Sequence, residues 1–153
     1  MKRNEKNEKS RAKILEAAIK EYGSKPYGET SINNICKENN ISKGLIYHYF
    51  KNVDGLYIAC VNECYTKLYE FLKENTLMES TDIQIKMRSY FEARSEFFKE
   101  NPYFRNIFSV SMFQRPSHLD KEIEKCREKL NEFNCRIIRN FIDCLTLREG
   151  ISK

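Results

Sequence analysis

The chain has 153 residues and a net charge of +5, a length that suits one domain or a small domain joined to a larger one. Hydrophobic residues make up 41% and charged residues 32%, and five glycines leave little material for a turn-rich β-architecture, so we expect an all-α fold. No stretch approaches the roughly 18 apolar residues of a membrane span, and no apolar segment follows the charged N-terminus, so we expect a cytoplasmic protein.

The positive charge is concentrated at the start of the chain. Residues 1–57 hold eleven Lys and Arg against seven Asp and Glu, whereas the remaining residues hold sixteen against fifteen. A basic first third followed by a nearly neutral remainder hints at a polyanion-binding head on a body with another task.

The first predicted helix runs from Ser10 to about Gly23, where the glycine acts as a stop signal. Its apolar residues recur at helical spacing: Ala12, Ile14, Leu15, Ala18, Ile19 and Tyr22. A loop with Pro26 and Gly28 follows. Thr30 is then a suitable N-cap for a short helix that carries Ile32, Ile35 and Cys36 inward.

A tight turn separates that helix from the next one. Asn39 and Asn40 tolerate the left-handed conformation that such a turn requires, and Ser42 is placed to cap the third helix. Asn52 or Asp54 caps a longer helix, which we expect to reach Asn75. Its apolar residues recur at helical spacing: Leu56, Tyr57, Cys60, Val61, Cys64, Tyr65, Leu68 and Leu72. Two short helices joined by about four residues and braced by longer ones form a helix-turn-helix, in which the second short helix enters the DNA major groove.

The segment "ISKGLIYHYF", residues 41–50, fits a DNA-contacting helix better than a helix meant only for packing. Glycine costs about 1 kcal/mol against alanine in a helix interior, yet Gly44 allows close approach to DNA. Lys43 and the backbone around Gly44 would lie against phosphate, and Tyr47 and His48 would reach phosphate or base edges. For Tyr49 and Phe50 we favour packing in the core.

Residues 10–57 resemble the DNA-binding region of the TetR family of bacterial transcriptional regulators. The resemblance rests on "TSINNICKENNISKGLIYHYFKNVDGLY", with Thr30 and Ser31 opening the second helix and Leu56 anchoring the fourth. The chain has Val53 where the family usually has a lysine, and Lys51 is the neighbouring basic residue. The predicted DNA-contact residues are Thr30, Ser31, Ser42, Lys43, Gly44, Tyr47, His48 and Lys51.

The resemblance implies a helix-turn-helix domain at residues 1–57 and a helical effector-binding and dimerisation domain at residues 58–153. It implies a homodimer on a palindromic operator in double-stranded DNA, most often a repressor, with a small-molecule effector. Because the body is nearly neutral and rich in Phe and Tyr, we expect this effector to be mainly apolar or aromatic. No catalytic constellation, metal cluster or cofactor motif is present in the sequence, so an enzyme is not expected.

Further helices are predicted in the body. Residues 82–100 carry an apolar stripe, an aromatic helix follows Pro102, and a long helix after Pro116 carries a near-heptad seam. Such stripes are more often core than pocket, and a pocket among five of their aromatic residues is a hypothesis: Tyr65, Tyr90, Phe91, Phe104 and Phe108. Gly150 as a helix stop and Ser152 as a cap suggest that a further helix would follow and that the chain is incomplete.

The cysteines leave a second function open. None of the six belongs to a CxxC pair, and Cys60 and Cys64 lie one turn apart on one helix face. We expect them to be reduced core residues, although a redox pair would have the same spacing. The alternative is therefore a small helical interaction or thiol-switch protein with a non-functional helix-turn-helix.

Overall fold

The computed structural model describes residues 3–144, and every regular element in this part of the chain is a helix, as the composition predicts. In chain order its elements are α1 (Arg3–Tyr22), η1 (Tyr27–Glu29), α2 (Ile32–Asn39), α3 (Lys43–Tyr49), α4 (Val53–Asn75), α5 (Ile83–Glu100), α6 (Pro102–Phe113), η2 (Ser117–Leu119) and α7 (Asp120–Cys144). None of the described helices combines the length and the apolar character needed to cross a bilayer.

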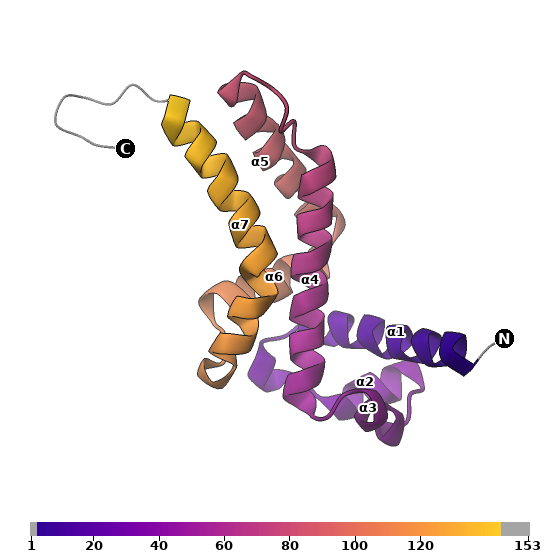
Figure 1. Ribbon diagram of the computed structural model, residues 1–153. Helices are drawn as coiled ribbons and strands as arrows, with labels where there is room; N and C mark the ends of the chain where they lie inside the picture. Colours follow the sequence, from indigo (N-terminus) through magenta and orange to yellow (C-terminus); the bar gives the residue numbers. More distant parts are fainter. Residues whose placement is uncertain (1–2, 145–153) are drawn as a thin grey trace.

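The helices form two groups that share α4. Helices α1, α2 and α3 gather at one end of α4, and α5, α6 and α7 pack along the rest of it (Figure 1). We call the first group the head and the second the body. The expected boundary between residues 57 and 58 falls inside α4, which runs without interruption from one group into the other. A displacement in the body can therefore reach the head through a single rigid element.

Helix α4 is the central core element, and its sequence periodicity explains why. Apolar side chains recur every three or four residues along α4, and all of these are buried. They face α1 at one end of the helix and the body helices at the other. The buried set is the one that the apolar pattern marks: Leu56, Tyr57, Cys60, Val61, Cys64, Tyr65, Leu68 and Leu72.

Two predicted boundaries differ from the structure. Helix α1 begins at Arg3 rather than at Ser10, because the preceding Lys- and Glu-rich residues are good helix formers even without an apolar stripe. Helix α7 begins at Asp120, and Leu119 lies in the short helix η2 before it, still buried. The predicted stop at Gly150 and cap at Ser152 lie outside the described residues.

The aromatic residues of the body serve mainly as core, as the spacing argument favours. Tyr65 and Phe104 are buried, and the Tyr65 hydroxyl lies 3.1 Å from the Ser111 hydroxyl. Phe91, by contrast, is 58% exposed. The five residues of the hypothetical pocket are thus spread between the core and the surface.

Candidate nucleic-acid interface

The turn between α2 and α3 has the geometry that its asparagines predict. Asn40 has φ 50° and ψ 51°, the left-handed conformation, and its N–H donates to the carbonyl of Cys36. This conformation ends α2 and redirects the chain into α3. Asparagine adopts it more readily than most residues, which explains the absence of a glycine at this turn.

Both short helices are capped by serine. Ser42 Oγ accepts from the N–H of Leu45 at 3.2 Å, as predicted. At the start of α2, however, the cap is Ser31 and not Thr30: Ser31 Oγ accepts from the N–H of Asn33 at 3.2 Å. Thr30 instead donates its hydroxyl to the carbonyl of Tyr27 at 2.6 Å, because η1 brings that carbonyl within reach. Ser31 and Ser42 thus use their oxygens as acceptors and keep their hydroxyl protons for other partners.

A buried carboxylate fixes the start of α2 against α1. Glu21 Oε1 accepts from the N–H of Ser31 at 3.1 Å, from Asn34 Nδ2 at 3.4 Å and from Lys25 Nζ at 3.0 Å. Burial alone would raise the pKa of Glu21, but the hydrogen bonds from Lys25, Ser31 and Asn34 outweigh it and hold this pKa below its usual value. Nothing in the sequence distinguishes Glu21 from the other glutamates, because two of its three partners, Ser31 and Asn34, come from the start of α2.

One side of α3 packs against the head. Ile46 and Phe50 are buried, and the guanidinium of Arg11 lies 5.2 Å from the centre of the Phe50 ring. Tyr49 is half-buried, and its hydroxyl donates to Asn7 Oδ1 at 3.3 Å. The expectation that Tyr49 and Phe50 serve packing is confirmed, and these contacts set the direction in which the opposite side of α3 points.

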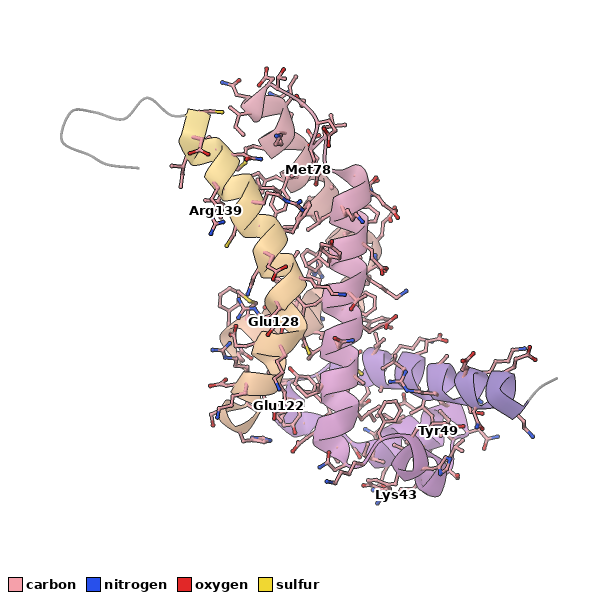
Figure 2. The ribbon with its side chains drawn as sticks, viewed as in Figure 1. Lys43, Tyr49, Met78, Glu122, Glu128 and Arg139 are labelled. Atoms are coloured by element: carbon pink, nitrogen blue, oxygen red, sulfur yellow. The ribbon has the colours of Figure 1, made fainter. Side chains whose placement is uncertain are left out.

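The opposite side of α3 faces solvent. Ser42, Lys43, Gly44, Tyr47 and His48 are all exposed, and Lys43 lies at the end of the molecule away from the body (Figure 2). A Cβ built on Gly44 would meet nothing within 4 Å, so the fold itself does not require glycine there. The predicted contact residues in α3 and its cap are therefore all exposed.

Lys51, the remaining predicted contact residue, follows α3. It is exposed and lies immediately before Asn52, whose Oδ1 accepts from the N–H of Gly55 at 2.8 Å and caps α4. Of the two predicted caps for α4, Asn52 is therefore the one used. Asp54 has a different partner set: it accepts a hydrogen bond from the Tyr27 hydroxyl and pairs with His118 of η2 at 3.4 Å. Asp54 thereby joins the head to the body.

Between residues 3 and 144 no group of His, Cys, Asp and Glu is placed to hold a metal ion. Cys60 and Cys64 lie on the buried face of α4, in the hydrophobic core, where burial raises the pKa of both thiols. Two capped short helices at a fixed angle, with one outward polar face, define a helix-turn-helix domain.

Comparison with known proteins gives this domain a family. Residues 14–60 match the model for bacterial regulatory proteins of the tetR family. This match bears out the resemblance that residues 10–57 show to the family.

Similar curated proteins are also regulators. The chain is 26% identical over 119 residues to the HTH-type transcriptional regulator YuxN of Bacillus subtilis, covering 78% of this chain and 40% of that protein. It is 32% identical over 63 residues to IcaR of Staphylococcus epidermidis, the negative transcriptional regulator of a biofilm operon, covering 41% of this chain and 34% of IcaR. The chain thus spans about two fifths or less of these relatives.

Solved structures confirm the fold over nearly the whole chain. A putative TetR-family regulator from Shewanella superimposes with a TM-score of 0.75 at 16% identity, covering 92% of this chain and 73% of that one. The fatty acid degradation regulator FadR of Bacillus halodurans superimposes with a TM-score of 0.74 at 15% identity, covering 93% and 76%. These relatives and neighbours are transcriptional regulators, not enzymes.

Proposed function

We propose that the chain is a DNA-binding transcriptional regulator that places α3 in the major groove of a palindromic operator. The observation that carries the proposal is the outward face of α3, in which a lysine, a glycine, a tyrosine and a histidine are exposed on a helix whose other face is buried. Recognition helices present this combination of short and polar residues to DNA.

The proposal gives each predicted residue a role. Lys43 and Lys51 neutralise phosphates, and the free hydroxyl protons of Ser31 and Ser42 donate to phosphate oxygens. Tyr47 and His48 reach base edges or phosphate. Gly44 lets the backbone approach the DNA closely, and Thr30 shapes the start of α2 through its bond to Tyr27.

We further propose that the protein acts as a homodimeric repressor in the cytoplasm and leaves its operator when a small, mainly apolar molecule binds the body. IcaR, a similar protein, is described as a negative regulator, which favours repression. In a dimer the two recognition helices must be spaced by one turn of DNA, about 34 Å. An effector that favours another spacing lowers DNA affinity by its differential affinity for the two states.

The thiol-switch alternative gains no support from the site. Both thiols of α4 are buried, and Cys64 Sγ donates to the carbonyl of Phe104 at 3.4 Å. A raised pKa keeps a thiol protonated, and the thiolate is the form that reacts.

DNA binding as a function of salt tests the proposal, with the DNA upstream of the protein's own gene as the probe. Lys43→Ala should weaken binding across all sequences and reduce the salt slope by about one unit, because one phosphate contact is lost. Lys73→Ala, at the exposed far end of α4, is the matched control and should change neither quantity.

Gly44→Ala supplies a second readout, because the fold has room for the methyl group. It should leave the protein folded and slightly more stable, by about 0.5–1 kcal/mol, while weakening its DNA binding. The assignment fails if the double variant Lys43→Ala with Tyr47→Ala binds DNA as well as the unchanged protein.

A further inference from the structure

An open groove of about 630 Å³ lies between α5 and α6, within the size range of small-molecule sites. Two of its lining side chains are aromatic, those of Phe91 and Phe98. Three of its lining side chains are cations: Arg94 and Lys99 of α5, and Arg105 of α6. No carboxylate lines the groove. Its composition therefore combines apolar surface with an uncompensated positive charge.

Arg94 is held in a fixed position at this groove. Its guanidinium carbon lies 5.1 Å from the centre of the Phe108 ring and 6.0 Å from that of Phe98. Its Nη1 donates to the Tyr90 hydroxyl at 3.1 Å, and that hydroxyl donates to Asn134 of α7 at 2.8 Å. Because stacking and one hydrogen bond already order the side chain, a ligand would lose little conformational entropy in binding its other donors.

The three cations have no acidic partner within the described part of the chain. Among the ion pairs of residues 3–144, none involves Arg94, Lys99 or Arg105. Arg115 and Arg127, by comparison, both pair with Glu124. A half-buried guanidinium without a carboxylate is poorly compensated, and an anion in the groove would supply the missing charge.

A second apolar cleft, of about 460 Å³ between α1, α4 and the start of α6, lacks this charge preference. Its two lysines are already paired, Lys20 with Glu16 at 2.9 Å and Lys67 with Glu63 at 3.5 Å. Of these two sites, only the groove between α5 and α6 has unpaired cations, and these favour an anionic ligand.

We propose that this groove binds a small organic monocarboxylate with an apolar body, in which Arg94 binds the carboxylate and Phe91 and Phe98 contact the apolar part. The planar guanidinium matches a carboxylate in a two-point contact, and Phe91, 58% exposed, offers a surface for an acyl or aryl group. The proposal rests on the proposed function, because it names the class of effector. It also places the ligand against α6, which contacts the head through α1.

Calorimetric titration of the full chain without DNA tests the site, with octanoate as the probe and octanamide as its neutral counterpart. We expect octanoate to bind on the order of tenfold more tightly than octanamide, a preference that Arg94→Gln should abolish. Arg136→Gln is the matched control. That guanidinium also lies over an aromatic ring, at 5.5 Å from the centre of Phe133, but outside the groove. The Arg136→Gln variant should therefore bind octanoate as tightly as the unchanged protein.

Equal binding of the acid and the amide, or unchanged octanoate affinity in Arg94→Gln, would overturn the proposal. If Arg94→Gln does not fold, the double variant Lys99→Gln with Arg105→Gln decides, because both side chains are exposed. It should weaken octanoate binding several-fold, and unchanged affinity would refute the site.

The DNA experiment separates this proposal from the proposed function. If octanoate binds in a way that requires Arg94 but does not change DNA affinity, the groove is a carboxylate site but not the effector site. If the unchanged chain binds its operator but does not bind octanoate, the groove is not a carboxylate site, and the proposed function as a DNA-binding regulator still stands.

Discussion

At the scale of single residues, Glu21 shows how a side chain far from the exposed face of α3 shapes the candidate interface. Its carboxylate belongs to α1 but binds the backbone of Ser31 and the side chain of Asn34 in α2. The angle between the first two helices thus depends on a buried charge that is satisfied by three donors.

We expect Glu21→Gln to lower the free energy of unfolding by about 1–3 kcal/mol at neutral pH, because buried donors lose a charged acceptor. A carboxylate whose pKa is lowered by folding stabilises the protein above its unfolded pKa, and this contribution disappears as the pH falls through the lowered value. Urea unfolding should therefore show a difference between the two proteins that shrinks in acid. A difference independent of pH would contradict this role.

Glu16→Gln is the control for that experiment. Glu16 also accepts from a lysine one turn away, Lys20 at 2.9 Å, but this pair lies on the surface of α1. Exposed pairs contribute little to stability, so this variant should unfold like the unchanged protein.

At the scale of helices, the contact between α1 and α6 depends on a glycine. A Cβ on Gly23 would lie 2.6 Å from the Cβ of Tyr103 and 2.7 Å from its Cα, closer than packed carbon atoms approach. Asn106 Nδ2 also donates to the Gly23 carbonyl at 2.7 Å. The glycine that the sequence marks as a helix stop is thus also the point at which the head docks against the body.

Gly23→Ala should move α6 away from α1 and lower the free energy of unfolding by about 1–3 kcal/mol, the usual cost of overpacking. Gly28→Ala is the matched control, because a Cβ there meets nothing within 4 Å, and it should cause no such loss. Equal stability of the two variants in urea would show that the head and body are not held together at Gly23.

At the scale of the whole molecule, α4 joins the head to the body, and its thiols lie in the core between them. Cys60 and Cys64 are both fully buried, and burial raises the pKa of each thiol, which disfavours reaction with oxidants. Cys135 and Cys144 of α7 are exposed. We therefore expect the buried pair to be structural.

Replacing Cys60 and Cys64 together with alanine should lower the free energy of unfolding by about 2 kcal/mol, because two small cavities form, without changing DNA affinity. A mild oxidant should leave the unchanged protein bound to DNA, as measured by fluorescence anisotropy. Release of the unchanged protein but not of the double variant would establish the thiol switch instead. Cys135→Ser separates effects of the exposed thiol from those of the buried pair.

The sequence by itself determined the elements whose causes are local. The spacing of apolar residues marked the buried face of α4, Asn39 and Asn40 marked the turn, and Ser42 marked the start of α3. For the start of α4 the sequence offered Asn52 or Asp54, and the structure uses Asn52. Each of these signals depends on residues within one or two turns of the chain, so it can be read without the fold.

Only the tertiary structure decided which residues from distant parts of the chain meet. The cap of α2 moved from Thr30 to Ser31 because η1 offers a carbonyl to Thr30. Glu21, the close approach at Gly23 and the stacked, unpaired Arg94 each depend on a neighbour from another helix. Packing brings these partners together across separations in the sequence that no local pattern records, and the proposed head–body coupling and ligand groove depend on them.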